Sequence, residues 1–347
     1  MTPGDPAPPP PIAPVRGSRP RPRVSVMLPT YRPDALLADA LRSVLAQAPA
    51  ADDMQITIVD DGSPAGLVED LVGTVDRSGR VEIVRHGERL GLAGNWNRAI
   101  ELARGHLVHL LHQDDLVLPG FYARVLAGFG RAPDIGMAFC RCRIVDGAGR
   151  LLKVNSRVGW FAGVLDGWLP RIAERIRVQT PAAVVARATY EALGGFRPDL
   201  VQALDWEMWV RIAARRRVWF EPRALAAYRR HAANETSRLF ATGRGWPDVA
   251  AAIAINARSL PPEVRDRVVA ASVRWHVSSA LRSVEALIAA GSRDLALDTL
   301  AAIPDLVRLL PGTPLSGRVR RRFAALSTRV TRECGAPAAG MPLEPCA

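Results

Sequence analysis

Three groups of polar residues follow short apolar runs in the first half of the chain, and their acidic members could bind a metal ion. The groups are Pro29-Thr30-Tyr31, Asp60-Asp61-Gly62-Ser63 and His112-Gln113-Asp114-Asp115. A divalent cation that neutralises a diphosphate takes oxygen ligands from one or two carboxylates, while the phosphates supply others. Asp114 and Asp115 provide such a pair. Alone, an Asp-Asp pair is more typical of a solvated acidic loop, so its meaning depends on what surrounds it.

The apolar runs before these groups have the composition of buried strands. Residues 24–28, 56–59, 81–84 and 107–111 are short and rich in apolar side chains. Helical spacing predicts one helix that begins near residues 33–34 and another over about 95–103. Such alternation predicts a Rossmann-like α/β fold with a mostly parallel sheet and helices on both faces. Ligands bind at the carboxyl ends of the strands in these sheets, where the polar groups lie.

The second half of the chain changes character. We expect further strands at 137–145, 183–186, 218–220 and 225–228, and a helix over 205–214. From residue 247 the sequence is rich in Ala, Leu and Arg and predicts a helical appendage of about four helices. The expected organisation is a disordered Pro-rich tail over 1–22, one α/β domain over 23–240, a helical region over 241–333, and a disordered tail over 334–347.

The order of the motifs resembles the family 2 glycosyltransferases, which are inverting enzymes of the GT-A fold. A strand with Pro29-Thr30-Tyr31, a strand with Asp60–Ser63, the segment Gly91–Ala99, and a strand with His112–Asp115 occur in that order. The resemblance covers roughly residues 24–237. His112 stands where the family often has an Asp, and Arg32 follows Tyr31 where the family commonly has Asn.

The resemblance implies a nucleotide-sugar donor and a bound Mg²⁺ or Mn²⁺. Tyr31 would lie against the base, Asp61 would bond the base or its ribose, and Asp114 would contact the ribose. Asp115 would ligate the metal, with His231 as a further ligand or phosphate contact. The implied donor-binding residues are Pro29, Tyr31, Asp61, Asn97, Asp114 and Arg229. Arg229 could pair with the diphosphate through two parallel hydrogen bonds.

The resemblance also implies a general base that removes the proton from the acceptor hydroxyl. Asp205 matches the family's base motif, although Leu204 stands where an acidic residue usually precedes it. The alternative for Asp205 is a helix N-cap, and Glu207 is the second candidate for the base. Gly195 and Phe196 match a turn on the acceptor side, where the alternative is a purely structural tight turn.

Composition bounds the remaining possibilities. The net charge is +12, but Lys153 is the only lysine and aromatic residues make up only 6% of the chain. Without basic–aromatic interleaving we do not expect a nucleic-acid partner. Cys140 and Cys142 would share one face of a strand, and we interpret them as buried free thiols, with a metal site as the alternative.

The expected partners are therefore a nucleotide-sugar donor and a glycan or lipid-linked acceptor. No apolar run is long enough to span a bilayer, and the start resembles no secretory signal. We expect a cytoplasmic protein, or one bound peripherally at the inner face of the membrane through Arg-rich C-terminal helices. Two rival functions stay open: a polyprenyl-phosphate sugar synthase and a catalytically silent nucleotide-sugar-binding protein. The arginines that would contact the membrane in the C-terminal helices are Arg318, Arg320, Arg321, Arg322, Arg329 and Arg332.

Overall fold

The computed structural model describes the chain except for residues 1–6, 18–19, 232–238, 240–244, 313 and 335–347. The described residues form two compact units. One contains the chain up to Trp168 together with Arg177–His231, and the other contains Leu169–Ile176 and the chain after His231. The predicted disordered tail at 334–347 lies, apart from Cys334, outside the described residues.

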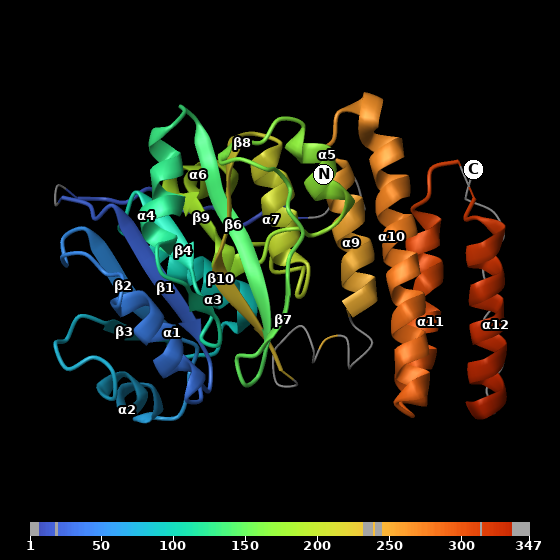
Figure 1. Cartoon of the computed structure of the whole chain (residues 1–347), viewed down its shortest axis with the longest axis horizontal. Helices are drawn as coiled ribbons and strands as arrows, with labels where there is room; N and C mark the ends of the chain where they lie inside the picture. The colour runs from blue at the N-terminus through green and yellow to red at the C-terminus, as the bar shows by residue number, and fades with distance from the viewer. Residues whose placement is uncertain (1–6, 18–19, 232–238, 240–244, 313, 335–347) are drawn as a thin grey trace. The chain divides into compact units, whose positions relative to one another are not determined.

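A single sheet organises the first unit (Figure 1). Its main order is β3-β2-β1-β4-β9-β6-β10-β5, with β7 beside β6 and β8 beside β10. The strands that the structure describes are β1 (Val24–Thr30), β2 (Met54–Asp60), β3 (Glu82–Arg85), β4 (Leu107–Leu110), β5 (Leu116–Val117), β6 (Ile135–Asp146), β7 (Leu151–Val154), β8 (Gly163–Val164), β9 (Ala183–Ala186) and β10 (Arg217–Arg230).

The α/β fold is confirmed, and the sheet proves to be mixed. Strands β3, β2, β1 and β4 run parallel, as do β6 and β10. Strand β9 pairs antiparallel with both β4 and β6 and so joins the two parallel halves. The two short strands predicted at 218–220 and 225–228 are one bulged strand, β10. Pro222 lies between them, and its missing N–H interrupts the ladder without ending the strand.

Helices cover both faces of this sheet. Strand β1 is buried along its whole length, with Val24, Val26 and Leu28 in a core that also contains Leu37 and Leu41 of α1. Helix α3 packs against β1, β2 and β4. The helices of the first unit are α1 (Leu36–Leu45), α2 (Leu67–Gly73), α3 (Gly91–Leu102), α4 (Phe121–Val125), α6 (Arg187–Leu193) and α7 (Leu204–Ala213), with 3₁₀ turns η1 (Leu126–Gly130) and η2 (Thr180–Ala182).

The Pro-rich start lies against the first unit over its described residues 7–17 and 20–22. The Pro10 carbonyl accepts a hydrogen bond from the Gly195 N–H at 2.7 Å, and the Ala13 carbonyl accepts one from Arg187 Nη2 at 3.0 Å. Ile12 is 3% exposed. This part of the chain therefore differs from the disordered tail that its proline content predicted. An extended Pro-rich strand leaves its carbonyls free, and neighbouring N–H groups can pair with them.

Cys140 and Cys142 are buried free thiols on β6, as their spacing predicted. Among the described residues neither belongs to a group of side chains that could hold a metal.

The second unit contains the four helices predicted for the C-terminal region. They are α9 (Gly245–Ala257), α10 (Pro262–Ala289), α11 (Arg293–Arg308) and α12 (Gly317–Cys334). The short α5 (Trp168–Glu174) also belongs to this unit from Leu169 on. Helix α10 packs against the other three, and α12 buries Phe323, Leu326 and Val330. Among the helices described, none is long and apolar enough to cross a membrane.

Candidate active site

Asp115 lies in the turn after β4 and is fully buried. Its Oδ1 accepts a 2.8 Å hydrogen bond from the backbone N–H of Arg229, near the end of β10. Its Oδ2 lies 3.1 Å from His112 Nδ1. Burial raises the pKa of the Asp115 carboxyl to about 6, the neighbouring Asp114 charge adds to this, and His112 opposes it. The carboxylate is thus held at a fixed place by one strand end and one ring.

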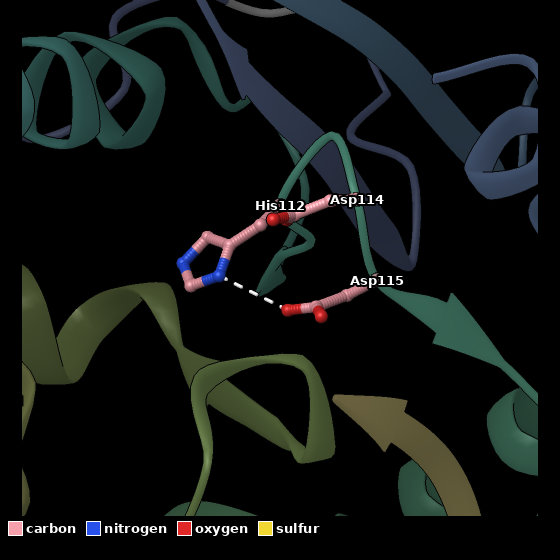
Figure 2. A group of neighbouring side chains, drawn as sticks. All are labelled: His112, Asp114 and Asp115. Atoms are coloured by element: carbon pink, nitrogen blue, oxygen red, sulfur yellow. Dashed lines mark hydrogen bonds and ion pairs between the residues drawn. The ribbon is translucent and has the colours of Figure 1, made fainter. Parts of the chain in front are cut away.

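Asp115 belongs to a group that could hold a metal ion. One potential ligand atom each from His112, Asp114 and Asp115 lies within 4.8 Å of the others, and Figure 2 shows the dashed contact from the His112 ring to Asp115. His231 Nε2 lies 2.9 Å from Asp114 Oδ2. The structure therefore brings the predicted metal ligands Asp115 and His231 next to Asp114, for which the sequence predicted a ribose contact, and adds His112 to the group. Two carboxylates and an imidazole fit a small divalent cation.

His112 is more than a replacement for an acidic residue. Its ring stacks on Trp96 of α3, with centroids 4.9 Å apart and planes at 27°. Burial lowers the pKa of His112, but the hydrogen bond and charge of Asp115, with the charges of Asp114 and Asp205, outweigh it and leave the pKa raised. Its buried Nε2 has no hydrogen-bond partner among the described residues. That nitrogen is available to a ligand.

Arg229 stabilises the acidic turn, by which we mean residues 112–115 after β4. Its side chain is buried, Nε donates to the Asp114 carbonyl at 2.9 Å, and Nη1 donates to the Gly147 carbonyl at 3.0 Å. Because the Arg229 guanidinium already donates to two backbone carbonyls, we interpret it as a positioning residue, whereas the sequence suggested a contact to the diphosphate.

Asp205 lies in the first turn of α7, and Ala203, not Asp205, is the N-cap residue. Its Oδ1 accepts the N–H of Trp206 at 2.7 Å, and its Oδ2 accepts the Thr180 hydroxyl at 3.3 Å. Burial raises the pKa of the Asp205 carboxyl to about 6, while the nearby His112 charge lowers it in part. The N-cap alternative is wrong, and the carboxylate is left with a pKa suited to proton transfer near neutrality.

Tyr31 follows β1 at the carboxyl edge of the sheet, two residues after Pro29, which pairs with Val59 of β2. Its N–H donates to Gln113 Oε1 at 2.9 Å, and Gln113 Nε2 donates to the Tyr31 carbonyl at 3.3 Å. The Arg89 guanidinium carbon lies 4.0 Å from the centre of the Tyr31 ring. One face of the ring thus carries a cation.

Asp61 is the second residue of the polar group Asp60–Ser63 and is buried. Its two carboxylate oxygens accept the backbone N–H groups of Leu90 and Gly91, at 2.6 and 3.0 Å. Because those groups open α3, Asp61 sets the position of the whole helix and satisfies two of its free donors. The sequence predicted that Asp61 bonds a base or its ribose. Its carboxylate would make that contact in addition to the two hydrogen bonds that it accepts from the start of α3.

The predicted acceptor-side residues form one braced turn. Glu207 and Arg211 make a bidentate pair at 2.9 and 2.8 Å, and Arg211 Nη2 donates to the Gly195 carbonyl at 2.9 Å. The Asn97 side-chain amide bonds both the N–H and the carbonyl of Phe196, at 2.6 and 2.8 Å. Asn97 and Glu207 are therefore engaged in holding this turn, whereas the sequence placed them in nucleotide binding and in base catalysis.

Several site residues were missed from the sequence. Gln113, Arg211 and Thr180 act through partners that are distant along the chain, and no local spacing marks them. Trp96 did carry a signal, since it is an aromatic residue inside the Gly91–Ala99 segment that forms most of α3.

The chain is similar to several known proteins. The glycosyl transferase family 2 model matches residues 25–181. A Mycobacterium tuberculosis relative, uncharacterized protein MT1568, is 32% identical over 239 residues, 66% of this chain and 73% of that protein. The uncharacterized glycosyltransferase MJ1057 of Methanocaldococcus jannaschii is 23% identical over 200 residues, 57% of this chain and 67% of that protein.

Among solved structures, S. aureus TarS 1-349 in complex with UDP-GlcNAc is similar with a TM-score of 0.67. It is 16% identical, and the similarity covers 90% of this chain and 92% of that chain. At that identity the likeness concerns the fold, which is the GT-A fold expected from the sequence. The matching family model, together with the ordered motifs and the Mycobacterium tuberculosis relative, shows that the chain belongs to glycosyl transferase family 2.

Proposed function

We propose that the chain is an inverting, metal-dependent glycosyltransferase that moves a sugar from a nucleotide-diphosphate sugar to an acceptor hydroxyl. The observation that carries the proposal is a pair of carboxylates, the buried Asp115 and the half-buried Asp205, each interacting electrostatically with His112. One belongs to a group suited to a cation and the other is suited to accept a proton. A single-step displacement needs those two functions on opposite sides of the anomeric carbon.

The metal site would hold Mg²⁺ or Mn²⁺. Asp115, Asp114 and His112 are the residues that would bind it, and His231 lies against Asp114 as a further candidate ligand. When bound, the ion supplies positive charge opposite the diphosphate that leaves. Arg229 keeps Asp115 and the Asp114 backbone in place for this task.

Asp205 would act as the general base. It accepts hydrogen bonds from the Trp206 N–H and the Thr180 hydroxyl, which fix the carboxylate in one orientation. A pKa of about 6 leaves it ionised at neutral pH and makes it a stronger base than an exposed Asp. Glu207 is a poor rival because both of its oxygens bind Arg211.

The donor would bind at the carboxyl edge of β1, β2 and β4. Tyr31, with Arg89 over its ring, offers a flat cationic surface for a base. Asp61 lies at the start of α3, where it accepts hydrogen bonds from the backbone N–H groups of Leu90 and Gly91. Because S. aureus TarS was solved with UDP-GlcNAc, uridine diphosphate sugars are the first donors to test. The acceptor would be a glycan or a lipid-linked sugar.

The experiment has two stages. A thermal-shift screen of nucleoside diphosphates and nucleotide sugars, with and without Mn²⁺, identifies the donor. Donor hydrolysis and sugar transfer are then measured for Asp205→Asn, with Asp52→Asn as the control because Asp52 is an exposed carboxylate before β2.

We expect Asp205→Asn to lower the transfer rate about 100-fold or more while donor affinity is kept. The control should match the parent. Unchanged transfer by Asp205→Asn would remove the base assignment. A donor that binds without any turnover by the parent chain would favour the catalytically silent binding protein.

A further inference from the structure

Most of the large exposed apolar side chains lie in one short stretch of the first unit. Of six such residues in the described chain, four are Leu151, Leu152, Trp160 and Phe161. Trp160 is 76% exposed and Phe161 is 86% exposed. Two adjacent aromatic side chains that are so open to water are unusual on a protein that has no partner for them. We refer to residues 150–161 as the aromatic–basic segment.

The same segment is positively charged. It contains Arg150, Lys153 and Arg157 and has no acidic residue. Arg150 is paired with Asp146 at 2.7 Å, just outside the segment. The Arg157 guanidinium carbon lies 5.3 Å from the centre of the Trp160 ring. Lys153 is exposed on β7. Positive charge and exposed aromatic surface therefore occur together.

The segment is mounted rigidly on the sheet. The Asn155 carbonyl accepts hydrogen bonds from Arg141 Nε and Nη2 at 3.2 and 3.0 Å, and Asn155 Oδ1 accepts the Cys142 N–H at 3.0 Å. Val158 is buried. The chain thus returns from β7 toward β8 beside β6 (Figure 1). Trp160 and Phe161 stay exposed although the residues before them are anchored.

This combination suits the boundary between lipid headgroups and acyl chains. Aromatic side chains favour that boundary, and nearby Lys and Arg are attracted to anionic headgroups. The Arg-rich helix α12, which the sequence suggested for this role, lacks a free apolar face. Its Phe323, Leu326 and Val330 are buried, and Arg322 is paired with Glu285 at 2.6 Å.

We propose that the aromatic–basic segment docks the protein on an anionic bilayer. Trp160 and Phe161 enter the headgroup boundary, while Lys153 and Arg157 contact the anionic headgroups. The inference goes beyond the proposed transferase activity and does not need it, because binding to lipid can be measured without a donor or an acceptor.

The test is flotation of the full chain with vesicles of phosphatidylcholine mixed with phosphatidylglycerol, and with vesicles of phosphatidylcholine alone. The variants are Trp160→Ser with Phe161→Ser, and Lys153→Gln with Arg157→Gln. Arg77→Gln is the matched charge control, since Arg77 is exposed elsewhere in the first unit. Thermal unfolding checks that each variant stays folded.

We expect the parent chain to float with the anionic vesicles and far less with phosphatidylcholine alone. The double aromatic variant should bind at least about tenfold more weakly. Loss of two cations should weaken binding by roughly fivefold for each charge, and Arg77→Gln should match the parent.

Three results would overturn the proposal. The first is equal flotation of the parent and the double aromatic variant. The second is a loss of binding only when Arg320 and Arg321 are replaced, which would assign the contact to α12. The third is concentration-dependent self-association of the parent, abolished by Trp160→Ser with Phe161→Ser and without vesicle binding, which would make the segment a contact between copies of this chain.

Discussion

The backbone N–H of Arg229 donates to Asp115 Oδ1 at 2.8 Å, although the two residues are 114 positions apart. The same arginine's side chain holds the Asp114 carbonyl. Through these bonds the end of β10 fixes the acidic turn that follows β4. The carboxylate that we assign to the metal thus owes its position to a strand from the far half of the domain.

Replacing Arg229 by Ala should destabilise the fold and weaken metal binding together. The backbone bond to Asp115 survives, but two carbonyls lose charged donors beside a buried carboxylate. The expected loss is about 3 kcal/mol in the free energy of unfolding, measured by urea denaturation. Arg230→Ala is the control, because Arg230 is exposed on the same strand. Lost transfer with unchanged stability and metal affinity would instead support a direct diphosphate contact.

Asp205→Asn should stabilise the protein at neutral pH. The folded-state pKa of Asp205 is raised from 3.8 to about 6, so folding favours the protonated form. The contribution of protonated Asp205 to the free energy of unfolding is fully present below about pH 4 and is lost as the pH rises through about 6. The neutral variant should gain about 2 to 3 kcal/mol in the free energy of unfolding at pH 7 and nothing below pH 4. Thermal unfolding across this range checks it, and a gain that persists at low pH would point to another cause.

His112→Asp should change which metal the protein prefers. An imidazole nitrogen suits Mn²⁺ better than Mg²⁺, whereas a third carboxylate suits both. We expect the parent to bind Mn²⁺ more tightly than Mg²⁺, and His112→Asp to narrow that preference by about tenfold. Electron paramagnetic resonance of free Mn²⁺, with Mg²⁺ as competitor, measures it directly. His112→Ala separates the lost ligand from the added charge, and identical preferences in all three proteins would exclude His112 from the ligand set.

Gly195→Ala should be costly because no space exists for a methyl group. A Cβ at this position would overlap with Asn97 Oδ1, and Asn97 is held by the Phe196 backbone. We expect a loss of about 2 to 4 kcal/mol in the free energy of unfolding. The double variant Gly195→Ala with Asn97→Ser should lose less free energy of unfolding than the sum of the losses of the two single variants. Gly163→Ala is the control, since no atom lies within 4 Å of its added Cβ, and an equal loss there would undermine the steric explanation.

Much of the first half of the fold was predictable because its signals are local. Strand β1 is a short apolar run, and α1 has apolar residues at helical spacing, so burial decides both. The turn that could hold a metal ion was predicted because Asp114 and Asp115 follow a strand end. Strand β10 was divided in two because Pro222 is a local signal, whereas the pairing with β6 that carries the strand past it is not.

The residues that hold the site in place could not be predicted in the same way. Glu207 and Arg211 are one helical turn apart, yet only the folded chain shows that Arg211 also reaches the Gly195 carbonyl. Asn97 was placed at the nucleotide because its segment matched a motif, and its partner Phe196 is 99 residues away. Capping of α3 by Asp61 likewise depends on the approach of two separate loops.

The extended start of the chain stabilises the turn that contains Gly195. The Pro10 carbonyl receives the Gly195 N–H and Ile12 is packed beneath it. A protein shortened to begin at β1 would leave that N–H and one Arg187 donor without these acceptors. Tension applied to the N-terminus, whether by a fusion partner or a tether, would therefore reach the turn that Arg211 of α7 also holds.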